Sequence, residues 1–120
     1  MPSFEEIARG NDFFRQTLET GEHAQLVAMT LQPGEEIGEE THEGDQILFF
    51  VEGEGEAILE GQASPVGEGD YTFVPAGTLH NFVNTGGGPL RLLTIYAPPE
   101  HPDGTVHRTK AEADAAEHHL

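Results

Sequence analysis

The sequence predicts an all-β fold, a sandwich or barrel of short antiparallel strands. Short apolar runs alternate with turn residues along most of the chain, and many of the 15 glycines lie between these runs. Signals for helix are confined to the two ends. Repeated short strands joined by glycine-rich turns are typical of a closed or two-layered β structure, because neither a helical bundle nor an α/β unit needs so many turns.

The elements follow in order from these signals. Ser3 and Glu6 form a capping box that opens a short helix over residues 4–9, and Gly10 ends it. Strands are expected at residues 13–18, 25–31, 46–52, 56–59, 62–66, 71–74, 79–83 and 90–96. Residues 97–104 contain three prolines and cannot form a central strand. A second capping box, Thr109 with Glu112, opens a helix that ends near residue 117. We expect one domain over residues 1–120, with its barrel at about 12–97 and an extension at 98–120.

Composition excludes several classes of function. The chain of 120 residues has no cysteine, which excludes disulfides and thiolate metal sites. It has no apolar run long enough to span a membrane and no visible signal peptide, so a cytoplasmic protein is expected. Lys and Arg number 5 against 22 Asp and Glu, a net charge of −17, which disfavours nucleic acid and anionic lipid as partners. Such acidity favours a halophilic protein from a salt-rich cytoplasm, and an acidic mesophilic protein is the alternative.

One stretch carries the candidate chemistry. Glu40, His42 and Gln46 stand at even spacings, so on an extended strand their side chains would share one face. A carboxylate, an imidazole and an amide oxygen are most of a coordination shell for a divalent metal, and His80 is the expected second nitrogen ligand. Mn or Fe suits this donor set best, and Ni or Zn is also compatible.

Alternative ligands lie in the same stretch. Glu43 and Asp45 would face away from the metal by strand alternation, but a bulge at Gly44 could bring Asp45 to the site in place of Gln46. A metal-free pocket, in which these polar side chains satisfy one another by hydrogen bonds, is the other alternative.

The remaining histidines and aromatic residues receive lesser roles. His107 follows a turn that could return it to the barrel mouth, whereas the other four histidines are expected in exposed or frayed positions without function: His23, His101, His118 and His119. Core or interface packing, rather than substrate stacking, is expected for Phe49, Phe50, Phe73 and Phe82.

The second hairpin carries the strongest pattern. Five residues have a fixed spacing that resembles the second cupin motif: Gly69, Pro75, Gly77, His80 and Asn84. The first stretch resembles the first cupin motif between Gly34 and Gly53, with two departures. The usual histidine pair is Glu40 and His42, and the usual glutamate is Gln46, so the site keeps a single negative charge at a different position.

The resemblance implies a small single-domain cupin of the RmlC-like superfamily. Its fold would be a double-stranded β-helix, a jelly-roll barrel, with a short helix at each end. Small cupins are often described as similar to mannose-6-phosphate isomerase, but a phosphosugar site needs a cationic clamp. Only Arg15 and Arg91 lie in the predicted barrel strands, and neither has a basic neighbour nearby in the sequence.

Three functions are compatible with this resemblance, because one fold hosts many activities. The first is a metal-dependent enzyme acting on a small organic molecule in the barrel, of the oxygenase, isomerase or lyase type. The second is a metal-dependent binding module without turnover, and the third is a cupin with an empty pocket. A homodimer is expected as well, because the first two strands are too apolar for an exposed edge; the residues concerned are Phe13, Phe14, Leu18, Leu26 and Val27.

Overall fold

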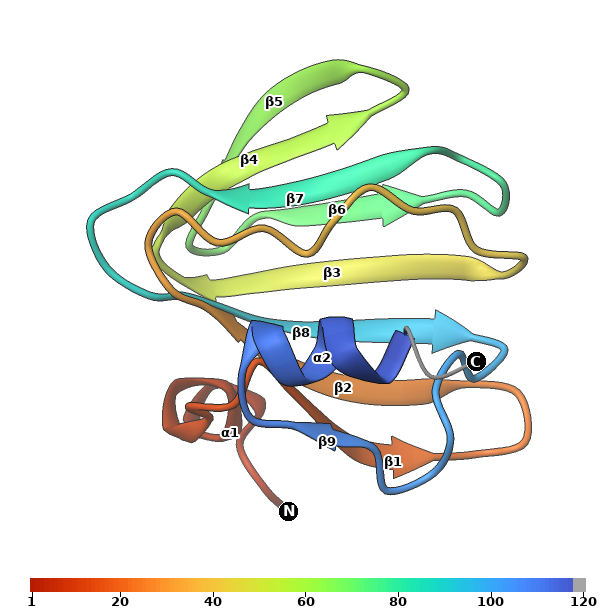
Figure 1. Ribbon diagram of the computed structural model, residues 1–120. Helices are drawn as coiled ribbons and strands as arrows, with labels where there is room; N and C mark the ends of the chain where they lie inside the picture. The colour runs from red at the N-terminus through yellow and green to blue at the C-terminus, as the bar shows by residue number, and fades with distance from the viewer. Residues whose placement is uncertain (118–120) are drawn as a thin grey trace.

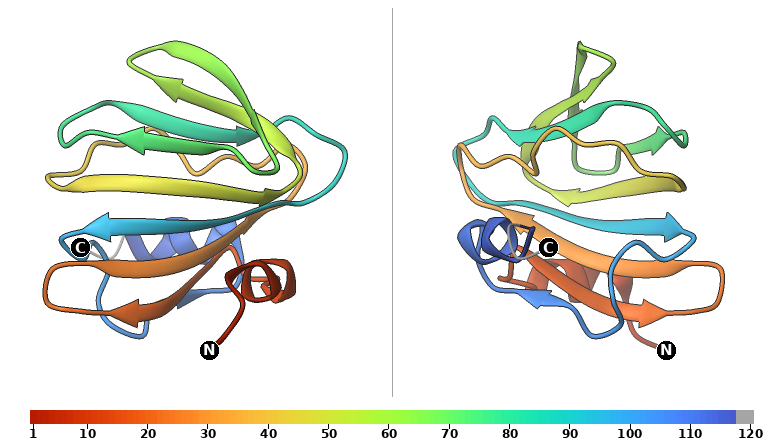
Figure 2. Two further views of the ribbon diagram at one scale, coloured as in Figure 1. Left: turned by 180° about the vertical axis from the view of Figure 1, so that it is seen from behind. Right: turned by 45° about the vertical axis from the view of Figure 1, so that its right-hand side comes forward.

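Strands follow the short apolar runs and pair into two antiparallel sheets (Figure 1). The computed structural model describes residues 1–117. The larger sheet has the strand order β6-β3-β8-β2-β1-β9, and the smaller sheet has the order β5-β4-β7. The strands are β1 (Arg15–Thr20), β2 (Gln25–Leu31), β3 (Asp45–Glu52), β4 (Glu54–Leu59), β5 (Gln62–Gly67), β6 (Tyr71–Val74), β7 (His80–Asn84), β8 (Leu90–Ala97) and β9 (Val106–His107). Figure 2 shows the same strands from behind and from the side.

The core lies between these two sheets. In antiparallel pairs, directly opposite residues face the same side of the sheet. One inward row therefore runs from Phe50 on β3 through Leu92 on β8 to Met29 on β2. These side chains form one buried cluster with Ala57 and Phe82 of the smaller sheet. Burial of this shared apolar surface joins the two sheets into one body.

A second inward row, nearer one end of the sheet, is polar. It places Gln46 of β3 opposite Tyr96 of β8, and Tyr96 opposite Gln25 of β2. All three side chains are buried. Buried polar groups need partners, so this end of the barrel is where ligands or hydrogen-bond networks are expected.

The two helices cover different surfaces. Helix α1 (Phe4–Gly10) begins at Ser3, whose hydroxyl accepts a hydrogen bond from the Glu6 amide, and its Ala8 packs on the outer face of the larger sheet. Helix α2 (Lys110–Glu117) contributes Ala113 to the inner core cluster. Among the described residues, neither helix is long and apolar enough to cross a membrane.

The expected elements are present, with boundary shifts of a residue or two, but two segments differ from expectation. The stretch around Glu40 is not a strand: Glu40 forms an isolated bridge with His80, and regular structure begins only at Asp45. The C-terminal extension also rejoins the sheet, because β9 pairs with β1 between His107 and Arg15. Two residues paired at an edge produce no periodicity in the sequence, so this strand could not be predicted from pattern.

Candidate metal centre

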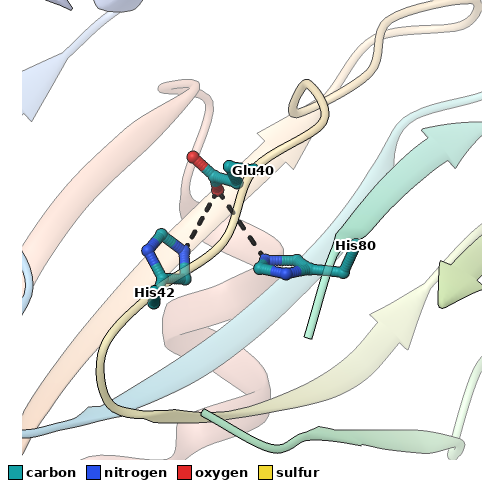
Figure 3. Close-up of side chains that lie close together, drawn as sticks. All are labelled: Glu40, His42 and His80. Carbon is teal, nitrogen blue, oxygen red and sulfur yellow. Dashed lines mark ion pairs between the residues drawn. The ribbon is translucent and has the colours of Figure 1, made fainter. Parts of the chain in front are cut away.

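Glu40, His42 and His80 converge at the polar end of the barrel (Figure 3). The bridge between Glu40 and His80 fixes two of them, since each amide donates to the other residue's carbonyl oxygen at 3.0 Å. The His42 carbonyl oxygen accepts a hydrogen bond from the Gly77 amide at 2.9 Å, which ties the irregular segment to the turn before β7. Backbone hydrogen bonds, rather than strand alternation, therefore bring the three side chains together.

The distances suit one shared ion. Oε1 of Glu40 lies 3.3 Å from Nε2 of His42 and 3.9 Å from Nε2 of His80. One ligand atom from each of the three residues lies within 4.8 Å of the others. Two ligands at right angles on an ion, each about 2.1 Å away, would be about 3 Å apart. The cluster is thus close to the size of a coordination shell.

Each imidazole is oriented by its other nitrogen. Nδ1 of His42 lies 2.9 Å from Oε1 of Glu100, and Nδ1 of His80 lies 2.9 Å from the Thr78 carbonyl oxygen. Both partners are acceptors, so each Nδ1 carries the proton and each Nε2 has a free lone pair. Nε2 of His42 and Nε2 of His80 are buried and have no hydrogen-bond partner among the described residues. Histidines that bind metals are held by acceptors in this way.

Gln46 shows the same signature. Its Nε2 donates to the Thr94 hydroxyl at 3.0 Å, while its Oε1 is buried and has no hydrogen-bond partner within residues 1–117. Because buried polar atoms are normally satisfied, a buried amide oxygen without a partner, on the polar row of the barrel, suits a cation. Within residues 1–117, hydrogen bonds between these side chains do not complete the metal-free network that the sequence left as an alternative.

The other carboxylates of the stretch are directed elsewhere. Oδ1 of Asp45 accepts a hydrogen bond from the Ala76 amide at 2.9 Å, and both Asp45 and Glu43 are exposed. Asp45 therefore stabilises the turn before β7.

Electrostatics within the cluster favour a charged pair. Burial alone would raise the pKa of Glu40, but the hydrogen bond and charge of His42 outweigh it and hold that pKa below its usual value. Burial opposes protonation of His42, yet Glu40 and Glu100 together raise its pKa above 6.5. His42 therefore takes up a second proton, on Nε2, more readily than an ordinary imidazole, and a metal ion at Nε2 would displace that proton.

Comparison with known proteins identifies the family. The cupin domain model matches residues 27–96, more than half of the chain. The chain belongs to the cupin family. Among curated proteins, the uncharacterized protein YrkC of Bacillus subtilis is 47% identical over 115 residues, which cover 89% of this cupin and 61% of YrkC. The cupin therefore spans about three fifths of the length of that relative.

Solved structures agree with the fold. The crystal structure of BH2720 from Bacillus halodurans superposes with a TM-score of 0.94 at 43% identity, over 96% of this cupin and 92% of that chain. An RmlC-like cupin with a double-stranded β-helix from Methanocaldococcus jannaschii superposes with a TM-score of 0.69 at 24% identity, over 75% and 84% of the two chains. The second likeness concerns the fold alone. This cupin is an all-β double-stranded β-helix.

Three residues of the cupin's site were not identified from sequence. Glu100 contacts His42, the ring of Tyr96 lies edge-on to His42 at 5.6 Å, and Arg15 is buried on β1. Glu100 and Arg15 belong to no local pattern with Glu40, because the tail and the first strand reach this end only through the tertiary fold. Only the inward-facing position of Tyr96, predictable from strand alternation on β8, could have indicated one of them.

The remaining expectations have mixed outcomes. His23 is exposed, as expected. His101 was expected to be exposed, but it is half-buried and its ring stands edge-on to Tyr96 at 5.2 Å. His107 returns to the sheet through β9 but is not part of the cluster. His118 and His119 lie outside the described residues.

The four phenylalanines fall into two groups. Phe50 and Phe82 are buried in the core, with ring centroids 5.9 Å apart. Phe49 and Phe73 are partly exposed on the outer face of the larger sheet, away from the site. Phe82 also lies edge-on to His80, with ring centroids 6.0 Å apart, so it packs against a residue of the candidate site.

Proposed function

We propose that this cupin binds one divalent metal ion through Glu40, His42, Gln46 and His80. The observation that supports the proposal is that Nε2 of both histidines, next to the Glu40 carboxylate, and Oε1 of Gln46 are buried without hydrogen-bond partners in the described residues. Two nitrogens and two oxygens form a borderline-to-hard donor set, which favours Mn or Fe over Ni or Zn.

The function that this centre supports best is that of a metal-dependent enzyme acting on a small organic molecule, of the oxygenase, isomerase or lyase type. A bound divalent ion would supply Lewis acidity toward a carbonyl or hydroxyl oxygen of the substrate. The chain orients the ligands of that ion, because Glu100 and the Thr78 carbonyl oxygen hold the two imidazoles in place. Glu40, whose side chain is 26% exposed, is the ligand most accessible to substrate. Its lowered pKa keeps it a carboxylate, which could also accept a proton.

A binding module without turnover is the second candidate. Burial raises the pKa of Tyr96 well above its usual value, so its hydroxyl stays protonated and serves only hydrogen bonding. Apart from Glu40, the described side chains of the centre are then ligands or groups that orient ligands. A site with few free acids or bases suits recognition of a ligand as well as its conversion.

Elemental analysis tests the metal centre directly. We expect about one divalent ion per chain in protein purified without metal-affinity steps. His80→Ala should lose the ion while the circular dichroism spectrum of the fold is unchanged, and the matched variant His23→Ala, on the exposed surface, should retain it. Metal-free wild-type protein, or His80→Ala with full metal content, would contradict the proposal.

Turnover separates the two functions. Metal-loaded protein would be incubated with a library of small organic molecules, with and without dioxygen, and the mixture examined by mass spectrometry. Product that disappears in His80→Ala identifies an enzyme. Ligand that is retained unchanged identifies a binding module.

A homodimer and a salt-rich cytoplasm complete the proposal. The acidic sequence supports the habitat, and apolar side chains on the outer face of the larger sheet support self-association.

A further inference from the structure

Arg15 is a buried cation at the centre of this barrel. It is 4% exposed, lies on β1, and faces the interior because it stands opposite Met29 of β2, a core residue. Removing a guanidinium from water is costly unless charges or hydrogen bonds replace its hydration. A hydrogen bond or charge that Arg15 lacks within the chain is therefore one that a ligand could supply.

Those contacts are incomplete. Nη1 of Arg15 lies 2.9 Å from Nδ1 of His107, and Nε of Arg15 is buried without a hydrogen-bond partner in the described chain. No carboxylate within residues 1–117 forms an ion pair with it. By contrast, Arg91, the other arginine in the barrel strands, pairs with Glu52 and with Asp12 on the surface. Arg15 and Arg108 are the two arginines without an acidic partner in the described residues, and of these only Arg15 is buried.

The two histidines and the tyrosine around Arg15 carry no compensating charge. Burial, reinforced by the Arg15 charge, lowers the pKa of His101 to about 4 and also lowers the pKa of His107, so both imidazoles are neutral near pH 7. The Tyr96 hydroxyl, which lies beside the guanidinium, is neutral as well. The net charge of this group of side chains is therefore that of Arg15 alone.

Tyr96 connects this cation to the metal centre. Its ring is edge-on to His42 at 5.6 Å on one side and to His101 at 5.2 Å on the other. The ring of Tyr96 is thus shared by a proposed metal ligand and the group of side chains around Arg15.

We propose that Arg15 binds the carboxylate of a small organic acid whose other oxygen atoms reach the metal centre. This inference rests on the proposed function and names its substrate class. A guanidinium presents two parallel N–H donors that match a carboxylate. The net charge of −17 repels anions at long range, so a buried cation is where an anionic substrate could be retained.

Acetate is the minimal probe, and acetamide is its uncharged counterpart. Melting temperature and calorimetric titration would be measured with sodium acetate against sodium chloride at equal ionic strength, with Mn(II) and with chelator. Ligand that binds only the folded state raises the melting temperature. We expect acetate to stabilise the wild type and acetamide not to do so. Arg15→Gln should bind acetate at least tenfold more weakly, and Arg91→Gln, at the half-buried arginine that pairs with Glu52 and Asp12, should bind as the wild type does.

A conservative variant guards against misfolding. Arg15→Lys keeps the charge but loses the two parallel N–H donors of the guanidinium. It should therefore fold, and it should bind acetate more weakly than the wild type. Equal responses to acetate and acetamide, no response of the wild type beyond chloride, or unchanged affinity in Arg15→Gln or Arg15→Lys would overturn the assignment. Metal content separates the two proposals. Metal-loaded protein without an acetate response contradicts only the role of Arg15, whereas metal-free protein with an Arg15-dependent response contradicts only the metal centre.

Discussion

At the scale of single residues, the metal centre depends on groups that would not touch the ion. Glu100 holds Nδ1 of His42 as an N–H donor and leaves Nε2 free. The Thr78 carbonyl does the same for His80. Sequence motifs predict the proposed ligands, but the side chain that orients His42 comes from the tail, and no strand constrains its spacing from those residues.

Glu100→Gln should weaken metal binding. Loss of a carboxylate that orients a ligating histidine lowers metal affinity by about 10- to 100-fold. Gln keeps the size of the side chain, so the fold should be unaffected. Titration with Mn(II), followed by calorimetry, measures the change, and Glu43→Gln, an exposed acid on the same segment as His42, is the control. Equal affinities in Glu100→Gln and the wild type would mean that His42 needs no orienting carboxylate.

His101 should make the stability of the fold depend on pH. Burial, with the nearby Arg15 charge, lowers its pKa to about 4 in the folded state, against 6.5 for an ordinary histidine. Between these pH values the unfolded chain binds the proton and the folded chain does not. Neutral His101 therefore contributes fully to the free energy of unfolding above pH 6.5, and this contribution is lost as the pH falls from 6.5 to 4.

Denaturant unfolding of the wild type and His101→Gln at several pH values tests this dependence. The stability difference between the two should change across pH 6.5–4 and be constant above it, whereas His23→Gln, at an exposed position, should track the wild type throughout. A pH-independent difference for His101→Gln would show that His101 titrates as it does in the unfolded chain.

At the scale of elements, the irregular segment before β3 decides whether the ligands meet. Glycine is required where this segment passes the end of β8: a Cβ on Gly44 would lie 2.5 Å from the Ala97 carbonyl oxygen and 2.7 Å from Cδ of Pro98. Both are rigid neighbours. The close approach keeps His42 near Glu100, because Glu100 follows these residues along the tail.

Gly44→Ala should therefore reduce both stability and metal affinity. Overpacking against backbone costs about 1–3 kcal/mol, and separation of the two segments should also weaken Mn(II) binding. Denaturant unfolding and metal titration measure the two effects. Gly87→Ala is the matched control, since a Cβ there would meet no atom within 4 Å. A variant at Gly44 as stable as the control would show that the tail moves freely.

The sequence predicted these elements unevenly. Strands with strong apolar patterns, such as β2 and β3, lie where expected, and His80 stands at the start of β7 as its motif implies. Strand alternation was the wrong reason for grouping Glu40 with His42, since their segment is irregular. Arg15 could not be assigned to the interior from sequence, because its partner His107 lies 92 positions away in an edge strand of two residues.

At the scale of the whole molecule, part of the outer face of the larger sheet, beside the region that helix α1 covers, remains uncovered by residues 1–117. The apolar residues of the first two strands, named above as the reason for a dimer, are largely accommodated within the chain: Phe14 and Val27 are buried, and β9 covers the edge of β1. Exposed aromatic side chains instead lie on β3 and β6, where Phe49 stands opposite Tyr71. This face, and not the β1 edge, is the better candidate for self-association.

A homodimer through this face is therefore predicted. Light scattering at micromolar concentration should give twice the mass of a 13.0 kDa chain. Phe73→Ser should shift the mass toward that of the monomer with little loss of fold stability, because Phe73 is 46% exposed. Val106→Ser, at a position 43% exposed on the edge strand β9, is the control and should stay dimeric. A monomeric wild type would contradict the prediction.

Salt should stabilise this protein, and it should stabilise the association of two chains more than the fold of each chain. Each chain carries a net charge of −17, so two chains repel one another as well as themselves at low ionic strength. At roughly 1 M salt the Debye length falls to about 3 Å, and most of that repulsion is screened. Melting temperature should therefore rise as KCl increases from roughly 0.05 to 2 M, and dissociation should precede unfolding as salt is removed.

Calorimetry and light scattering would follow both transitions, with Mn(II) and with chelator, because a bound cation also relieves repulsion at Glu40. Phe73→Ser separates the two effects, since its melting temperature reports the fold without the dimer. A melting temperature that is flat or falls over this range in both series would show that the acidic surface is no adaptation to salt.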